Sequence, residues 1–339
     1  AKEAKSKSIK LAELTGVKLP LKFFPDERNS VKSYIQVLEQ VKLPACAIVA
    51  VPDHLHYEVT SACLEKGLHT LVVKPLTSNV KEANKLVSLA KKHDLYGTVE
   101  FHKRWDRQNR ILHGLFQQGE LGSPLYTWTE YSQRKSIPSK VFRSWVERIN
   151  ILQYLGVHYI DIVRFVTGAI PERVMATGQK TWFKKQDLDI YDAIQCMVEW
   201  KTTEGHIFNQ TLLVNWIDPE TSSAMSDQKI KFVGTNGRFE GDQKERGVRI
   251  LIDGKSLEEP NPDFCRDYKT ADGNLSWEGY GIESINYFLN DVYSIIHKKK
   301  TPQYFEGKRP TFSEALFSTA VIESATESLK NQSDWVSIK

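Results

Sequence analysis

The chain has 339 residues, of which 40% are hydrophobic and 26% charged, a composition typical of a globular protein large enough for two domains. Its 46 basic and 42 acidic residues leave a net charge of +4, so the charge balance gives no reason to expect a nucleic-acid or anionic-membrane partner. No apolar stretch reaches the roughly 20 residues that a membrane span requires, and residues 1–10 have no signal-peptide core.

The four cysteines are Cys46, Cys63, Cys196 and Cys265. They form no CxxC pair and have no histidine at zinc spacing, so no metal site is predicted. Cys46 and Cys63 fall in an apolar strand and on the apolar stripe of a helix, which predicts reduced core thiols. A cytoplasmic protein is therefore expected.

The first elements are predicted to be a helix, a short strand and a second helix. The helix covers residues 2–15 and ends at Gly16, the strand covers residues 19–24, and the second helix covers residues 31–41. A glycine directly after an apolar stripe is typical of a helix end.

From residue 47 short apolar runs alternate with amphipathic helices. Strands are predicted at residues 47–51, 71–73 and 97–101, with helices at residues 57–67 and 79–94 between them. Crossovers this short are right-handed and produce a parallel sheet. The polar residues that follow each strand must then meet at one edge, where open α/β sheets bind their ligands. These residues are 52–56, 74–75 and 102–104.

After a helix at residues 106–118, strands follow one another in series. They are predicted at residues 125–131, 173–178, 193–200, 206–215, 229–233, 238–241 and 248–252. A hairpin loop is expected at residues 201–205, and helices at residues 281–297 and 311–330. The pattern predicts an α+β domain with a large, mostly antiparallel open sheet, and a domain division into residues 1–105 and 106–339.

A helix predicted at residues 152–168 carries polar residues on one side. Tyr154, His158 and Asp161 are spaced i, i+4 and i+7, which places them in one line. Such a line is typical of a cleft wall, although a single histidine on a helix is more often a core or surface residue.

Three motifs resemble those of the glucose–fructose oxidoreductase and inositol dehydrogenase family (Gfo/Idh/MocA). They are Val-Pro-Asp-His-Leu-His at residues 51–56, Lys74-Pro75 after a strand, and a strand ending in Phe101 shortly before Arg104. The resemblance implies a Rossmann-like parallel sheet followed by an α+β domain. It also implies an oxidoreductase that uses NAD or NADP to oxidise or reduce a carbinol of a sugar, polyol or sugar derivative, as a homodimer or homotetramer.

The resemblance places one set of residues beside the dinucleotide. They are Val51, Pro52, Asp53, His54, His56, Lys74, Pro75 and Glu100. Judged from the residues alone, Asp53, His54 and His56 are as well suited to cap the helix that follows them. In the family the residue that selects NAD or NADP precedes residue 1, so the choice between them is left open.

By the same resemblance Lys74, His158 and Tyr154 form the catalytic group. His158 is the expected general base and Lys74 the residue that holds the substrate oxygen. Two positions depart from the family pattern, because Val73 stands where it has a glutamate and Tyr154 where it has an aspartate. Without the resemblance, Lys74 is equally well explained as a lysine that extends from a strand end toward water.

The substrate is expected to contact Arg104, Trp145, Arg148 and Asp161. Arg104 can bind a carboxylate or a group of hydroxyls with two hydrogen bonds, and a surface salt bridge is its alternative role. Trp145 and Arg148 resemble a Trp-Arg element that covers the family's substrate pocket.

The chain has no GxGxxG turn for a pyrophosphate. In the family this turn precedes the part that resembles this sequence, so we expect an upstream segment in the natural protein. The alternative is a protein that has lost dinucleotide binding. Two other functions therefore stay open: an NAD-dependent glycosidase that oxidises its sugar transiently, and a non-catalytic member of the family.

Overall fold

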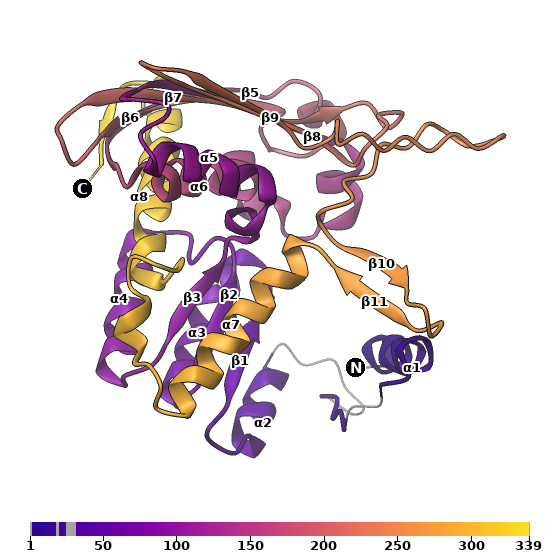
Figure 1. Ribbon diagram of the computed structural model, residues 1–339. Coiled ribbons are helices and arrows are strands. Elements are labelled where there is room, and N and C mark those ends of the chain that lie inside the picture. Colours follow the sequence, from indigo (N-terminus) through magenta and orange to yellow (C-terminus); the bar gives the residue numbers. More distant parts are fainter. Residues whose placement is uncertain (1, 18–19, 25–31, 339) are drawn as a thin grey trace.

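The computed structural model describes residues 2–17, 20–24 and 32–338, and these residues form two main sheets joined by helices, with a separate two-stranded hairpin. A small parallel sheet lies at the bottom of Figure 1, and a wide seven-stranded sheet lies across the top. Helices α5 and α6 lie directly beneath the wide sheet, and α7 and α8 extend down to the small one.

The small sheet confirms the predicted strand-helix alternation. Its elements are β1 (Cys46–Val49), α3 (His56–Glu65), β2 (His69–Val73), α4 (Val80–Lys92) and β3 (Gly97–Glu100). The strands are parallel in the order β1-β2-β3. Helix α4 begins where the Asn79 side chain accepts a 2.9 Å hydrogen bond from the Glu82 amide, and the chain leaves α3 through Gly67 at φ +89°.

The start of the chain agrees with the prediction only for its helices. Helix α1 (Lys2–Thr15) ends at Gly16, which has φ +69°, and α2 (Ser33–Gln40) precedes the first strand. The strand predicted at residues 19–24 is wrong for the described residues 20–24, which form none. No described strand lies beside them, and an extended segment without a neighbour has no partner for its backbone groups. Residues 19 and 31 lie outside the described part.

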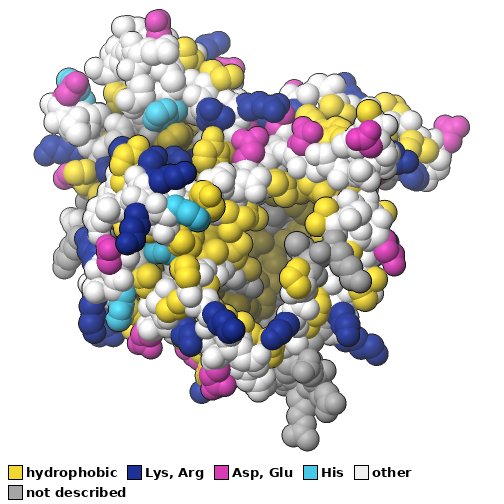
Figure 2. Space-filling view, turned by 60° about the horizontal axis from the view of Figure 1, so that its bottom comes forward, with side chains coloured by type: hydrophobic (Ala, Val, Ile, Leu, Met, Phe, Trp, Pro, Cys, Tyr) yellow, Lys and Arg dark blue, Asp and Glu magenta, His cyan; other side chains and the backbone are white. Residues whose placement is uncertain are grey.

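Strand β1 is the edge of the small sheet in the described part of the chain. It pairs with β2 on one side, and Ile48 at its centre is 46% exposed. Figure 2, seen from the lower side of Figure 1, shows a hollow with hydrophobic side chains on its floor and lysine and arginine side chains at its rim. An apolar strand edge of this kind can pair with another strand.

The wide sheet confirms the predicted α+β architecture. Its strands are β4 (Pro124–Arg134), β5 (Ile170–Gln179), β6 (Ala193–Lys201), β7 (Ile207–Asp218), β8 (Ser226–Gly234), β9 (Arg238–Asp242) and β12 (Val336–Ser337). They lie in the order β12-β5-β6-β7-β4-β8-β9, and every pair except β4–β7 is antiparallel.

One predicted strand is wrong, and one hairpin was missed. Residues 248–252 form no strand, because their apolar side chains are not buried: Leu251 is 78% and Ile252 is 50% exposed. The hairpin of β10 (Arg266–Lys269) and β11 (Leu275–Glu278) carries mostly polar side chains and gave no apolar signal.

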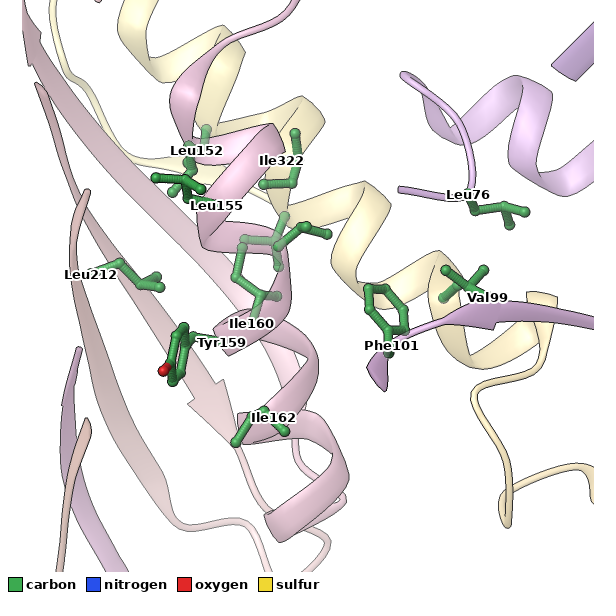
Figure 3. Packing of buried hydrophobic residues seen from close by; sticks show 14 of the residues in the cluster. Leu76, Val99, Phe101, Leu152, Leu155, Tyr159, Ile160, Ile162, Leu212 and Ile322 are labelled. Carbon is green, nitrogen blue, oxygen red and sulfur yellow. The ribbon is translucent and has the colours of Figure 1, made fainter. Parts of the chain in front are cut away.

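A continuous core connects the two sheets. Helices α5 (Arg107–Gln117), α6 (Val157–Thr167) and α8 (Phe312–Lys330) bury their apolar sides on the wide sheet. Figure 3 shows Tyr159 and Ile160 of α6 between Leu212 of the wide sheet and Phe101 at the end of β3. Because close-packed interiors resist deformation, this core holds the edges of the two sheets at a fixed distance.

The last helices also cover the small sheet. Tyr96 packs against Phe288 of α7 (Tyr280–Ile296), with ring centroids 5.9 Å apart, and Thr98 of β3 pairs with Thr311 just before α8. No helix in the described part of the chain is long and apolar enough to cross a membrane.

Candidate active site

A cavity of about 590 Å³ lies where the carboxyl edge of the small sheet faces the wide sheet. Lys74 follows β2, and His102 and Lys103 lie in a short helix after β3. Tyr154 lies in the turn that precedes α6, and His158 lies at the start of α6. The opposite wall comes from strands β4 and β8 and from residues 258–266. The three residues predicted as catalytic are therefore brought to one cavity, together with two residues that the sequence placed at this edge without assigning them a role.

Lys74 is held by the backbone and ring of Tyr154. Its Nζ donates a 2.7 Å hydrogen bond to the Tyr154 carbonyl and lies 3.8 Å from the centroid of the ring. Burial lowers the pKa of Lys74 to about 8, although the carboxylates of Asp53 and Glu100 act in the opposite direction. Lys74 can therefore donate or accept a proton near neutral pH.

The turn before His158 differs from the predicted continuous α-helix. Residues Leu152–Gly156 form a π-helical turn that leads into α6. Gly156 permits this turn, because a Cβ at that position would lie 2.5 Å from Cδ1 of Leu152. The wider turn changes the predicted spacing: Tyr154 and His158 both line the cavity, and Asp161 does not. Turns of this type occur often at functional sites.

His158 is buried in a cationic environment. Its Nδ1 has no hydrogen-bond partner among the described residues. Burial holds the pKa of His158 well below its ordinary value, and the nearby cations Lys74 and Lys103 act in the same direction. The imidazole is therefore neutral at pH 7 and able to accept a proton.

His102, which the sequence placed at this edge without a catalytic role, forms a second imidazole centre. Its ring lies 4.7 Å from the ring of His158, and its Nδ1 lies 2.9 Å from Oε2 of Glu100. Ser284 donates a 2.8 Å hydrogen bond to the other oxygen of Glu100. A carboxylate bonded to one ring nitrogen fixes the orientation of the imidazole. The spacing Glu-x-His at the end of β3 was the available signal.

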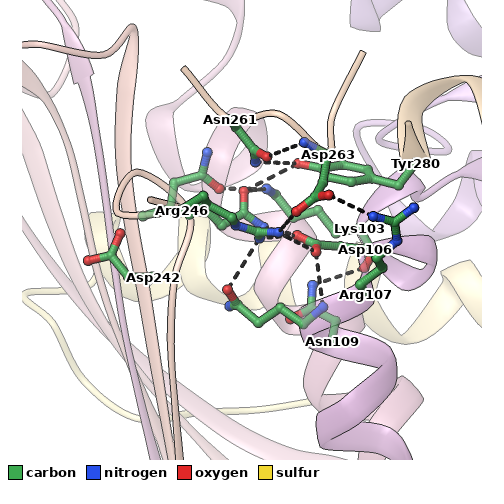
Figure 4. A network of polar contacts seen from close by, with 12 residues as sticks. Lys103, Asp106, Arg107, Asn109, Asp242, Arg246, Asn261, Asp263 and Tyr280 are labelled. Atoms are coloured by element: carbon green, nitrogen blue, oxygen red, sulfur yellow. Dashed lines mark hydrogen bonds and ion pairs between the residues drawn. The ribbon is translucent and has the colours of Figure 1, made fainter. Parts of the chain in front are cut away.

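Lys103 was also predicted to lie at this edge, but neither its burial nor a role for it was predicted. It is 2% exposed, and its Nζ donates hydrogen bonds of 2.5 and 2.9 Å to the amide oxygens of Gln228 and Gln243. Figure 4 shows it beside a network of Asp106 and Arg246. The sequence gave no signal for its burial, because both of its partners lie more than 100 residues away.

Of the residues predicted to line the dinucleotide, Asp53 and His56 are buried and His54 is exposed. Asp53 accepts a 2.8 Å hydrogen bond from Gln153 Nε2. The two ring nitrogens of His56 lie 2.6 and 2.9 Å from the carbonyls of Pro75 and Val51, so His56 ties the ends of β1 and β2 together. The capping alternative is wrong, because no side chain caps α3.

Arg104 and Asp161 bind each other instead of facing the cavity. Arg104 Nε and Nη2 donate hydrogen bonds of 2.8 and 2.6 Å to the two oxygens of Asp161, and both side chains are buried. Neither side chain lines this cavity, so their contact with substrate stays a prediction. The alternative of a surface salt bridge is wrong, because the pair is buried.

Trp145 and Arg148 also lie outside the cavity lining. Trp145 packs behind Tyr154, with ring centroids 6.5 Å apart, and stacks on Phe142 at 4.9 Å. Arg148 is exposed. Burial is the main cause of the lowered pKa of His54, and the charge of Arg148 lowers it further. The two residues thus support and border the site from its outer side.

Comparison with known families identifies both halves of the chain. A family model described as "Oxidoreductase family, NAD-binding Rossmann fold" matches residues 2–101, and one described as "GFO/IDH/MocA C-terminal domain" matches residues 110–240. The chain belongs to the Gfo/Idh/MocA oxidoreductase family. The family resemblance of the three motifs is thereby confirmed.

Several curated proteins are similar in sequence to part of this chain. A scyllo-inositol 2-dehydrogenase (NADP(+)) of Bacillus subtilis is 29% identical over 136 residues, 38% of this chain and 37% of that protein. A myo-inositol 2-dehydrogenase of Thermotoga maritima is 25% identical over 210 residues, 61% of this chain and 59% of that protein. The chain thus spans well under two thirds of these relatives.

Solved structures of the family share the fold. The structure described as an inositol dehydrogenase homolog complexed with NAD+ from Azotobacter vinelandii has a TM-score of 0.68 at 18% identity and covers 90% of this chain and 82% of that chain. The structure of a myo-inositol 2-dehydrogenase from Lactobacillus plantarum has a TM-score of 0.67 at 17% identity, covering 91% and 84%.

Proposed function

We propose that this protein is an NAD(P)-dependent oxidoreductase that acts on a CH–OH carbon of a sugar, polyol or sugar derivative. One observation carries the proposal: Lys74 and His158, which come from different parts of the chain, line one cavity at the carboxyl edge of a parallel sheet. Family membership and the dehydrogenase names of the relatives support it.

A bound nicotinamide supplies or accepts the hydride in this proposal. The described residues fit the nicotinamide end, because Lys74 at the end of β2 lines an open cavity and the carboxylate of Glu100 at the end of β3 is close enough to raise its pKa. We assign Val51, Pro52, Asp53, His54, Pro75 and Glu100 to the cofactor side and His56 to the support of that edge. Relatives are named with both NADP and NAD, so we propose no choice between them.

The side chains of the cavity have distinct proposed roles. Neutral His158 accepts the hydroxyl proton when the substrate is oxidised, and Lys74 donates a hydrogen bond to the same oxygen. Tyr154 supplies no carboxylate, and it positions Lys74 through its carbonyl and ring. The Glu100–His102 pair lies against His158 and provides the carboxylate–imidazole unit that the Tyr154 position lacks.

We further propose a homodimer or homotetramer in the cytoplasm. In Figure 1 no α-helix of the described residues covers the upper face of the wide sheet. Its strands carry exposed apolar side chains, among them Tyr126, Ile170 and Ile207, at 47%, 50% and 50% exposure. Such side chains suit association of two sheets. The four free cysteines suit a reducing compartment.

The test is a dinucleotide reduction assay with a panel of inositols, hexoses, amino sugars and sugar acids. We expect one class of substrate to reduce NAD or NADP, and Lys74→Met and His158→Gln to lower kcat by about a hundredfold or more. Lys92→Gln, at the exposed end of α4, is the control. Lack of dinucleotide binding by the full-length natural protein, measured by calorimetry, would contradict the proposal and favour a non-catalytic protein.

A reaction without net redox change is the second candidate. A protein named 2,7-anhydro-N-acetylneuraminate hydratase from Mediterraneibacter gnavus is 27% identical over 215 residues, 61% of this chain and 54% of that protein. A hydratase or a glycosidase with transient oxidation would convert its substrate while NADH does not accumulate. Product analysis of the same incubations separates the two reactions.

A further inference from the structure

Lys103 brings a buried positive charge to the wall of the cavity. It is 2% exposed and lies in the short helix His102–Trp105, which follows β3. Its Nζ lies 5.5 Å from the ring centroids of Tyr131 and of Tyr159. An ammonium group in such surroundings has lost most of its hydration, which is unfavourable unless hydrogen bonds or an opposite charge replace the water.

The protein supplies the hydrogen bonds without the opposite charge. Gln228 and Gln243 accept two of the three hydrogens of the ammonium group, at 2.5 and 2.9 Å. Among the described residues no carboxylate forms an ion pair with Lys103. The nearby Asp106 is occupied by Arg246, whose two terminal nitrogens lie 2.7 and 3.0 Å from its oxygens.

Gln243 stands between the two charges. Its amide nitrogen donates a 2.6 Å hydrogen bond to Asp106 while its amide oxygen accepts the one from Lys103. The lysine is therefore separated by one amide from a carboxylate that an arginine already neutralises. In agreement with this arrangement, burial lowers the pKa of Lys103 to about 7, and Asp106 offsets this only in part.

Other cations add to the excess of positive charge. Lys74, Arg134 and Arg266 also line the cavity, against the carboxylates of Glu258 and Glu259. Glu259 is already engaged, because it accepts hydrogen bonds from Ser223 and from Nε of Arg249. Lys74 is bonded to a carbonyl and not to a carboxylate.

We propose that the substrate of this cavity carries an anionic group, a carboxylate or a phosphate, and that Lys103 binds it. This inference rests on the proposed function. The third hydrogen of the ammonium group is available to an anionic oxygen, and a charge-assisted bond to a buried ammonium group is strong. A neutral sugar has hydroxyl groups for the hydrogen bond but leaves the charge uncompensated.

Calorimetric titration of the wild-type chain tests the inference with matched sugars. The probes are glucuronate and glucose 6-phosphate, with glucose as the neutral counterpart, and they separate the carboxylate from the phosphate. We expect at least one anionic sugar to bind about tenfold or more tightly than glucose. Equal affinities for charged and neutral sugars, or no binding of either anionic sugar, would overturn the inference.

Variants assign the effect to Lys103. Lys103→Met and Lys103→Gln, checked for native circular dichroism, are expected to lose about tenfold or more in affinity for the anionic sugar and to leave that for glucose unchanged. Lys92→Gln is expected to bind as the wild type does. Binding enthalpies of the wild type, measured in buffers of different ionisation enthalpy, are expected to show that Lys103 takes up protons when the anionic sugar binds. Both Lys103 variants should lack this proton uptake. Unchanged anion affinity in both variants would refute the role of Lys103.

Dinucleotide titrations of the same samples keep the two proposals apart. A protein that binds the anionic sugar but no dinucleotide retains this inference and loses the proposed oxidoreductase activity. A protein that reduces dinucleotide only with neutral polyols retains the activity and loses this inference.

Discussion

Lys74, after β2, contacts Tyr154 in the turn before α6 at the cavity. The lysine Nζ lies 2.7 Å from the tyrosine carbonyl oxygen and 3.8 Å from the centroid of its ring. The family pattern has an aspartate at the position of Tyr154. In this chain the lysine instead contacts the backbone carbonyl dipole and the π face of the Tyr154 ring. The carbonyl and the ring stabilise the charged form of the lysine less than a carboxylate would. The effect of burial is therefore the larger one, and the pKa of Lys74 falls to about 8.

Tyr154→Asp is expected to raise the pKa of Lys74 above this value, because a carboxylate stabilises the neighbouring ammonium. The limb of the pH–rate profile that reports Lys74 would move to higher pH. Tyr154→Phe keeps the carbonyl and the ring, so its profile should match that of the wild type. Coincident profiles for Tyr154→Asp and the wild type would show that Lys74 does not control that limb.

Glu100→Gln is expected to lower kcat by about tenfold to a hundredfold, because His102 loses the carboxylate that orients it. His102→Gln should have a similar effect, and the double variant should be no worse than either single one, since the two residues act as a unit. Ser284→Ala removes one hydrogen bond to Glu100 and should have the smallest effect. Additive losses in the double variant would argue against a coupled pair.

Arg104→Met is expected to lower the free energy of unfolding by about 3–5 kcal/mol, because it leaves the buried Asp161 carboxylate without its partner. The double variant Arg104→Met/Asp161→Leu, which removes both charges, should recover much of this loss. Urea denaturation measures the free energy of unfolding of the single and the double variant. If Arg104 bound substrate instead, Arg104→Met would raise KM while leaving the urea midpoint unchanged.

Lys103 is expected to make stability depend on pH. Its pKa is about 7 in the folded protein, against an ordinary value of 10.5, so between these values the unfolded chain holds more protons on this group. The free energy of unfolding should therefore rise with pH across that window, by on the order of a few kcal/mol, and be lowest below pH 7.

Urea denaturation at about pH 6.5 and about pH 9.5 tests this dependence. The free energy of unfolding of Lys103→Met minus that of the wild type should be larger at the lower pH than at the higher pH. A difference between the two proteins that stays constant with pH would show that Lys103 keeps an ordinary pKa in the fold.

Gly97→Ala is expected to destabilise the fold by about 1–3 kcal/mol through overpacking. The added Cβ would lie 2.4 Å from Cε2 of Phe312, a buried ring of α8 that has little room to move. Gly114→Ala is the matched control, because its Cβ meets nothing within 4 Å and α5 should gain about 0.5–1 kcal/mol. Thermal unfolding of the two variants gives the comparison.

Local patterns in the sequence determined much of the architecture. The helices at residues 2–15, 79–94 and 311–330 were predicted correctly, because apolar periodicity and end signals such as Asn79 and Gly16 act within a few residues. Parallel strands with short crossovers also predicted that Lys74 and the residues after β3 would share one edge, since connection length and handedness restrict the topology. The position of His158 beside this edge followed from the family motif.

The tertiary structure alone decided which polar residues face the cavity. Arg104 and Asp161 were expected to bind substrate, and they bind each other across 57 residues of chain. Lys103 is buried by Gln228 and Gln243, which lie 125 and 140 residues further along. Residues 20–24 form no strand although their pattern predicted one, because a strand needs a neighbour. Local sequence sets the backbone conformation that a segment prefers, whereas burial, ion pairing and pKa depend on partners that only folding brings together.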